Sequence, residues 1–209
     1  QILVRQHMLE RRQIAQGAPF QLFLSADEEF AEALAKDGHA ESGGAVYAVG
    51  RLAFYVPQGS PVGIDNRLKD LGSASADGRL KRLAIANPEL APYGRATREA
   101  LQHVGLWDGI KGKLVLGENV GQTARFLTTG EAQAGFIPLA LAGSAELKAR
   151  GAWSTVPESW HAPLRQRMVL IRGAGDTARA FYRFMLEPQA QALLKQHGIR
   201  VLELNNTGD

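Results

Sequence analysis

The fold is decided by two short stretches, Ala86-Asn87-Pro88-Glu89-Leu90-Ala91-Pro92-Tyr93-Gly94-Arg95-Ala96 and Gly117-Glu118-Asn119-Val120-Gly121-Gln122. Each follows a short apolar run and leads into a helical pattern, so each predicts a strand, a turn and a helix start. The first N–H groups of a helix lack partners within it, and the helix start carries a partial positive charge. Such a start suits an anion without a basic side chain. Two starts facing each other would form an anion clamp.

Strand and helix patterns alternate along the whole chain, which favours an α/β fold. Residues 45–56 form a long extended stretch that predicts a strand crossing between two lobes, and residues 168–171 predict the return. Two lobes joined by two crossover segments describe a hinged clamshell. The first lobe would consist of residues 1–50 and 172–209, and the second of residues 51–171.

Several residues predict where individual elements begin. Asp27 is expected to cap a helix that follows a strand at residues 20–24, and Asn119 is expected to cap another. Asp176 is expected to cap a C-terminal helix, and residues 200–204 are expected to form a last strand. The tail after residue 204 is expected to fray.

The composition excludes several kinds of chemistry. The 209 residues contain no cysteine, which rules out disulfides, thiolate catalysis and zinc–sulfur sites. The net charge of +3 comes from scattered basic residues, and no basic–aromatic cluster indicates nucleic-acid binding. No apolar run has the roughly 18 residues that a membrane span needs.

No catalytic or metal-binding arrangement is evident. The 5 histidines are not spaced as metal ligands, and no phosphate-binding lysine loop or nucleophile elbow is present. Ser25 and Asp27 imitate part of a catalytic triad, but helix capping is the more ordinary role for Asp27. The sequence therefore predicts no enzyme, no cofactor and no bound metal cation.

Four segments resemble the molybdate-binding periplasmic proteins of ABC transporters, in that family's order. The run Pro-Glu-Leu-Ala-Pro-Tyr-Gly-Arg-Ala is the most specific of these matches, and the resemblance covers about residues 13–204. The segments are residues 17–27, 85–96, 116–120 and 157–171.

The resemblance implies the type II periplasmic binding protein fold and capture of a tetrahedral dianion, molybdate or tungstate. It implies that backbone N–H groups at Tyr93 and Val120 bind the oxyanion. Some members add a tyrosine hydroxyl from the returning crossover, where this chain has Gln166, so that contact is expected to be absent or altered. Arg95 is a further accessory candidate, although a solvated helix face is its more ordinary role.

The N-terminal residues depart from the family. Its members begin with a further strand–helix–strand unit whose loops carry hydroxyl-bearing residues, and residues 1–12 do not match that unit. The first lobe is therefore expected to be incomplete, with an open sheet edge beside Phe20, Leu22 and Leu24. An open edge and exposed apolar side chains favour self-association. Weak or undetectable oxyanion binding is also expected, because a dianion needs most of its oxygens satisfied and the missing loops would carry part of the donors.

The sequence thus predicts a periplasmic solute-binding protein that captures molybdate or tungstate and delivers it to a membrane permease. Two alternatives remain open. One is a sensory or interaction module on the same fold, and the other is a truncated chain with impaired binding. An enzyme on this fold is disfavoured because no nucleophile–base pair is evident.

Overall fold

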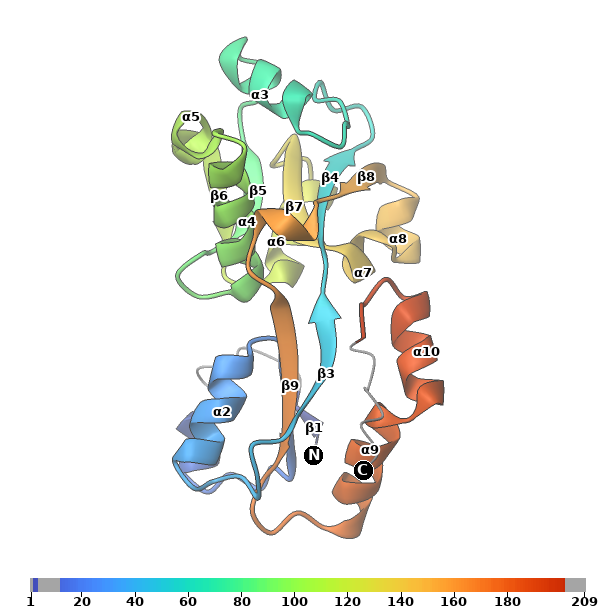
Figure 1. Ribbon diagram of the computed structural model, residues 1–209. Coiled ribbons are helices and arrows are strands. Elements are labelled where there is room, and N and C mark those ends of the chain that lie inside the picture. Colours follow the sequence, from blue (N-terminus) through green and yellow to red (C-terminus); the bar gives the residue numbers. More distant parts are fainter. Residues whose placement is uncertain (1, 4–11, 202–209) are drawn as a thin grey trace. The chain divides into compact units, whose positions relative to one another are not determined.

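The computed structural model describes residues 2–3 and 12–201. The chain divides into two compact units, unit 1 from Gln1–Gly50 with Leu164–Asp209, and unit 2 from Arg51–Pro163. Both units combine a sheet with helices, which confirms the α/β class (Figure 1). The first boundary lies after Gly50. The second lies before Leu164 rather than after residue 171, because the returning strand pairs with strands of unit 1.

Unit 1 contains a sheet with the strand order β1-β2-β9-β3. Strand β1 is parallel to β2, whereas β9 is antiparallel to both of its neighbours. Phe23 and Val169 pack against α2 on one face, and Leu22 and Met168 pack beside the C-terminal helices on the other. The elements are β1 (Ile2–Leu3), β2 (Leu22–Ser25), α2 (Glu28–Lys36), β3 (Ala45–Gly50), β9 (Leu164–Leu170), α9 (Asp176–Leu186) and α10 (Pro188–Gln196).

The expected open edge beside β2 is wrong. Strand β1 pairs with Leu22 and Phe23, so β2 lies between two strands. The side chains of Leu22 and Leu24 are 0% and 6% exposed, and Phe20 is partly buried against the α2 side of the sheet. The edge of β2 is therefore covered at Leu22 and Phe23, and self-association stays a prediction that no longer rests on exposure of these side chains.

Unit 2 contains a sheet with the order β6-β5-β7-β4-β8, in which β5, β6 and β7 are parallel to one another. Helix α6 packs on the face that includes Ala84 and Ile137, and α4 contacts β4, β5 and β7. The strands are β4 (Leu52–Pro57), β5 (Leu83–Ala86), β6 (Leu114–Gly117), β7 (Ala134–Pro138) and β8 (Gly151–Thr155). The helices are α3 (Lys69–Ala76), α4 (Pro92–His103), α5 (Trp107–Ile110), η1 (Lys111–Lys113), α6 (Val120–Thr128), α7 (Leu139–Ala142), α8 (Ala145–Lys148) and η2 (Glu158–Trp160).

Three sequence predictions about individual elements need correction. The single strand expected at residues 45–56 is divided at Arg51 into β3 and β4, which belong to different sheets. Asp176 is the first residue of α9, and Gly175 holds the cap position. Of the last expected strand, Arg200 forms an isolated bridge with Val49, and residues 202–204 lie outside the described part of the chain.

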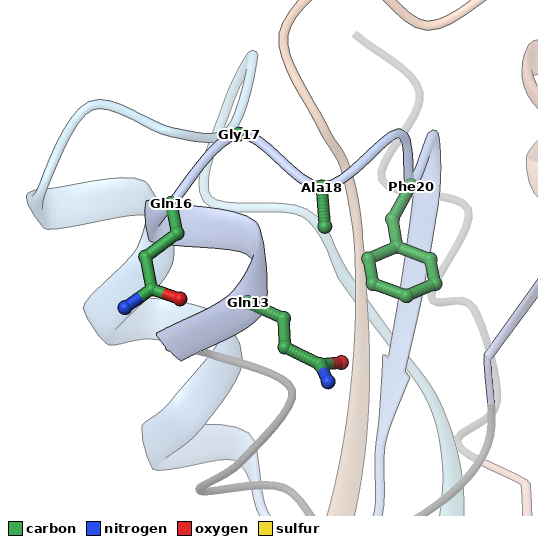
Figure 2. Close-up of a pocket in the computed structure, with 5 residues that line it drawn as sticks. All are labelled: Gln13, Gln16, Gly17, Ala18 and Phe20. Atoms are coloured by element: carbon green, nitrogen blue, oxygen red, sulfur yellow. The ribbon is translucent and has the colours of Figure 1, made fainter.

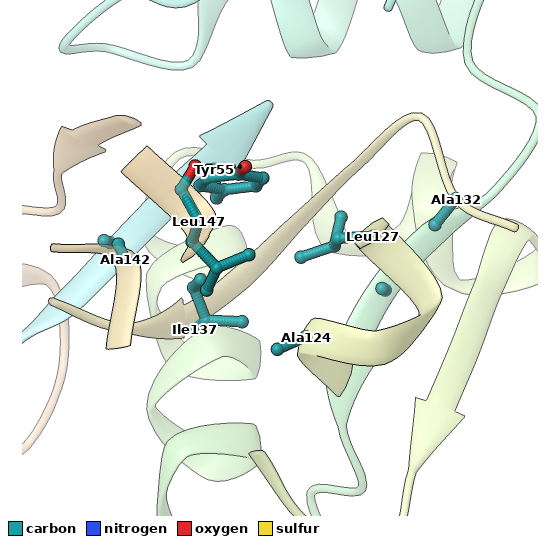
Figure 3. Close-up of a cluster of buried hydrophobic side chains, with 9 residues drawn as sticks. Tyr55, Ala124, Leu127, Ala132, Ile137, Ala142 and Leu147 are labelled. Atoms are coloured by element: carbon teal, nitrogen blue, oxygen red, sulfur yellow. Dashed lines mark hydrogen bonds between the residues drawn. The ribbon is translucent and has the colours of Figure 1, made fainter. Parts of the chain in front are cut away.

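The core of unit 2 includes a hydrogen-bonded tyrosine. Tyr55 on β4 is 1% exposed, and its hydroxyl donates to the carbonyl oxygen of Leu147 on α8 at 2.8 Å. Figure 3 shows Tyr55 and Leu147 beside Ile137, with Ala124 and Leu127 contributed by α6. Burial raises the pKa of Tyr55, so the phenol stays protonated and can donate. This bond ties α8 to β4, the neighbour of the edge strand β8.

Replacing Tyr55 by phenylalanine is expected to lower the free energy of unfolding by about 1–3 kcal/mol. The ring and its packing remain, but the carbonyl oxygen of Leu147 loses its buried donor. Urea denaturation followed by circular dichroism measures the difference. An unchanged midpoint would show that water replaces the phenol without cost.

Candidate functional site

The two helix starts singled out in the sequence follow neighbouring parallel strands. Ala86 at the end of β5 pairs with Gly117 at the end of β6, and the N–H of Asn87 donates to the carbonyl oxygen of Gly117 at 2.7 Å. Helix α4 begins after β5, and helix α6 begins after β6. Both starts therefore lie at the carboxyl edge of the same sheet, where α/β proteins commonly bind ligands. The anion clamp stays a prediction, and this shared edge is a placement that it requires.

The start of α4 has few amides to offer. Pro92 occupies the first helical position and has no N–H. The amides of Gly94 and Arg95 both donate to the carbonyl oxygen of Ala91, at 3.0 and 3.1 Å. Tyr93 is the second residue of the helix, and its side chain is 8% exposed. The first turn of α4 therefore lacks an N–H at Pro92 and has two amides that are bonded within the helix.

The start of α6 has two adjacent amides available. Asn119 caps the helix by accepting the N–H of Gln122 at 2.9 Å, and Gln122 Oε1 in turn accepts the N–H of Glu118 at 2.7 Å. The N–H of Thr123 donates to the carbonyl oxygen of Asn119. Within the described residues, the amides of Val120 and Gly121 have no acceptor, and both residues are at least partly exposed. The side-chain caps thus leave two neighbouring donors in contact with solvent.

Glycines allow both helix starts to approach the strand ends closely. A Cβ atom on Gly94 would lie 2.2 Å from the carbonyl oxygen of Ala86. A Cβ atom on Gly117 would lie 2.6 Å from Oγ1 of Thr123, in the first turn of α6. Only glycine fits at either position without moving the neighbouring atoms. The sequence therefore fixes each helix start against the end of the strand that leads to it.

The two accessory candidates lie in different units. Arg95 is half-buried in the first turn of α4, in unit 2. Gln166 is in β9 of unit 1, where its Oε1 accepts a hydrogen bond from the hydroxyl of Tyr47 at 3.0 Å. Burial raises the pKa of Tyr47 to about 12, so this hydroxyl remains a donor at neutral pH. Gln166 thus has an intramolecular partner on the neighbouring strand β3.

The catalytic and metal alternatives gain no support from the geometry. Asp27 caps α2 by accepting the N–H of Glu29 at 3.1 Å, as its sequence position predicted. Its own N–H lies 3.2 Å from the hydroxyl oxygen of Ser25. Over residues 2–3 and 12–201, no three histidine, aspartate or glutamate side chains are grouped as metal ligands. Asp27 therefore has a structural role in this turn.

Two open hollows lie apart from the helix starts. One, of about 390 Å³, is lined in unit 1 by residues 13–20, and Figure 2 shows Gln13 and Phe20 extending into the same space. The other, of about 510 Å³, lies in unit 2 between residues 56–64 and residues 148–152. Neither is lined by Tyr93, Val120 or Gly121.

The described helices include none that is both long and apolar enough to cross a membrane.

The sequence analysis missed Gly121 and Gln122. The signal was present in the spacing of Asn119 and Gln122, because a cap residue followed three positions later by glutamine is typical of a reciprocal cap. This pattern predicts an occupied amide at Gln122, whereas in the structure Gln122 Oε1 accepts from Glu118 rather than from the cap residue Asn119. Val120 and Gly121 are the two residues between the cap residue Asn119 and Gln122, and their amides form the adjacent pair.

Residues 9–200 match the family model described as bacterial extracellular solute-binding protein. The molybdate-binding protein ModA of Azotobacter vinelandii is 35% identical over 190 residues, which cover 89% of this chain and 73% of that protein.

Two solved structures have similar folds. The periplasmic molybdate-binding protein of Azotobacter vinelandii superposes with a TM-score of 0.81 at 31% identity, over 93% of this chain and 84% of that one. The sulfate-binding protein SubI of Mycobacterium tuberculosis H37Rv gives a TM-score of 0.73 at 16% identity, over 93% and 73% of the two chains. At 16% identity, the similarity to SubI shows a shared fold only. Because proteins named for molybdate and for sulfate share this fold, the fold alone does not identify the oxyanion.

Proposed function

The chain belongs to the bacterial extracellular solute-binding proteins, with the type II periplasmic binding fold of the molybdate-binding proteins, and we propose that it captures molybdate or tungstate. Like its relatives, it is a binding protein and not an enzyme. The oxyanion is its ligand rather than a cofactor. The observation that carries the proposal is the pair of adjacent amides at Val120 and Gly121, at the start of α6.

The chemistry of this helix start suits a tetrahedral dianion. Two neighbouring N–H groups can donate to two oxygens of one anion, and the helix dipole adds a partial positive charge. Tyr93, at the start of α4, is the proposed further backbone donor at the same edge of the sheet. Arg95 and Gln166 are proposed only as accessory groups. Selectivity would then depend on the spacing of neutral N–H donors. A protonated oxyanion would bind less well, because its hydroxyl group would face an N–H donor.

We propose that the protein acts in the periplasm and delivers its oxyanion to the membrane permease of an ABC transporter. The support comes from the family and from relatives that are periplasmic molybdate-binding proteins. A sensory module on the same fold remains the alternative for this ligand-binding role. Self-association also stays a prediction, to be measured by light scattering at micromolar concentration.

Molybdate and tungstate are expected to raise the melting temperature, whereas sulfate is not. A ligand at 100 times its dissociation constant stabilises the native state by about 2.7 kcal/mol. For a chain of this size that corresponds to a shift on the order of 5–10 °C. Differential scanning calorimetry with each sodium salt at equal ionic strength measures the shifts. A larger shift with sulfate or with a nucleotide would refute the assignment to molybdate and tungstate, and no shift with any salt would favour a chain with impaired binding.

The Tyr93→Phe variant is expected to bind molybdate within about threefold of the parent, an effect below 1 kcal/mol. The proposed contact uses the backbone N–H, which the substitution keeps. Isothermal titration calorimetry gives the comparison. A loss of tenfold or more would show that the phenol hydroxyl binds the anion or holds the site together.

A further inference from the structure

A single residue connects strand β6 to the cap of helix α6. The strand ends at Gly117, Asn119 is the N-cap, and Glu118 stands between them. The strand side is fixed, because the N–H of Asn87 donates to the carbonyl oxygen of Gly117 at 2.7 Å. The helix side is fixed as well, because the N–H and the hydroxyl of Thr123 donate to the carbonyl oxygen of Asn119, at 3.1 and 2.9 Å. The backbone at Glu118 is therefore the part of the turn that still needs a constraint.

The side chain of Gln122 supplies that constraint. Its Oε1 accepts the N–H of Glu118 at 2.7 Å, while its own N–H donates to Oδ1 of Asn119 at 2.9 Å. One residue of the first helical turn is thus bonded both to the connecting residue and to the cap. Val120 and Gly121 lie between the cap and Gln122, so these two bonds enclose the pair of amides without using either N–H group.

The bond from Glu118 to Gln122 matters more for the shape of the turn than for folding. Both residues are exposed, so water can replace either partner at little cost to stability. Without the bond, the backbone at Glu118 can take other conformations, in which the amides of Val120 and Gly121 no longer point at one anion. An anion binds only the fraction of molecules in the competent form, so its apparent dissociation constant rises as that fraction falls.

Glutamine also keeps the turn free of additional charge. Glutamate at the third helical position can accept backbone N–H groups in the same way. A carboxylate there would place a negative charge beside a bound dianion, whereas the carboxamide of Gln122 is neutral. Among residues 117–124 the only ionisable side chain is that of Glu118, which is exposed. Gln122 therefore holds the turn without repelling an anion.

We infer that Gln122 is a positioning residue of the oxyanion site. Its carboxamide oxygen holds Glu118 so that the amides of Val120 and Gly121 are presented to one tetrahedral anion before the anion arrives. The inference rests on the proposed function, because it needs an oxyanion at the start of α6. Gln122 touches no ligand in this scheme. Its loss changes the population of the binding form in the free protein and leaves the bound form the same.

The test replaces Gln122 by methionine, which has a similar length and helix propensity but no comparable acceptor. The ¹⁵N-labelled full-length protein is titrated with sodium molybdate by NMR, and calorimetry gives the dissociation constant. We expect that constant to rise about fivefold or more, which converts to about 1 kcal/mol. The amide signals of Val120 and Gly121 are expected to leave their parent positions in the free variant and to return to them at saturation. A general loss of structure would not give this return.

Two further variants serve as controls. Gln102→Met makes the same substitution at an exposed glutamine near the end of α4, and its affinity is expected to stay within about twofold of the parent. Gln122→Glu keeps an acceptor oxygen, so the Glu118 amide should exchange with solvent as slowly as in the parent. Its added charge should weaken molybdate binding at low salt. The ratio of its dissociation constant to the parent's should then approach one at about 1 M sodium chloride, where the screening length is about 3 Å.

The outcomes separate the two proposals. Parent affinity in Gln122→Met, or an equal loss in Gln102→Met, overturns the positioning role and leaves oxyanion capture standing. Saturated signals that differ from the parent's overturn it in favour of a direct contact between Gln122 and the anion. No response of the parent protein to molybdate overturns the proposed function, and the positioning role with it. Circular dichroism checks folding, and Gln122→Ser, whose side chain is too short to reach Glu118, replaces the methionine variant if that variant does not fold.

Discussion

Replacing Val120 by proline is expected to weaken molybdate binding by about 10–100-fold, the loss of roughly 1–3 kcal/mol that follows when a desolvated partner is left unpaired. Val120 is the first residue of α6, a position that proline favours because its ring presets the helical φ. Asn119 before it has a φ of −149° and a ψ of 172°, an extended conformation that a following proline requires. The substitution therefore removes one donor and spares the helix.

Val120→Ala is the matched control. It also removes the valine side chain beyond Cβ, but it keeps the backbone N–H. We expect its affinity to stay within threefold of the parent in calorimetric titration, well under 1 kcal/mol. Circular dichroism and thermal denaturation should give similar melting curves for both variants. Equal losses in the proline and alanine variants would mean that the side chain of Val120, and not its amide, forms the site.

Replacing Gly94 by alanine is expected to destabilise the protein by about 3 kcal/mol or more, at the upper end of what overpacking costs. The new Cβ atom would lie 2.2 Å from the carbonyl oxygen of Ala86 and 2.7 Å from two further backbone atoms of Asn87 and Pro88. Backbone atoms cannot rotate away as a flexible side chain can. The first turn of α4 must therefore move away from β5, which also displaces the Tyr93 amide.

Gly109→Ala is the control for this second variant. Gly109 lies in the short helix α5, and a Cβ atom there meets nothing within 4 Å. Alanine is favoured over glycine in a helix by about 1 kcal/mol, so this variant should be as stable as the parent or slightly more stable. Urea denaturation distinguishes the two. A Gly94→Ala variant as stable as the parent would show that α4 is free to shift on the strand.

The sequence predicted the parts of the site that depend on local patterns. The run Leu83–Ala86 has no polar residue and forms a strand that is 0–1% exposed. Asn119 stands where a cap is needed, and its side chain accepts the expected amide. Both features follow from the hydrophobic pattern and from the partners that a helix start lacks, so neighbouring residues are sufficient to predict them.

The sequence did not predict features that depend on long-range pairing. Strand β8 was missed because its residues are recognisable as a strand only when β4 pairs with them. The break at Arg51 was missed because β3 and β4 are both extended, and only their partners place them in different sheets. The pairing of β1 with β2 was not predicted, because the sequence around Ile2 and Leu3 does not indicate which strand they pair with. In each case the deciding contact joins residues far apart in the chain.

The most direct test of oxyanion capture at the start of α6 is a titration of the ¹⁵N-labelled protein with sodium molybdate, followed through the backbone amides by NMR. A hydrogen bond to a dianion moves an amide proton downfield. We predict that the amide protons of Val120 and Gly121 move downfield and saturate with molybdate, with much smaller changes at the capped amides of Glu118 and Gln122. Shifts confined to other parts of the chain, with Val120 and Gly121 unchanged at saturation, would contradict the assignment of the site.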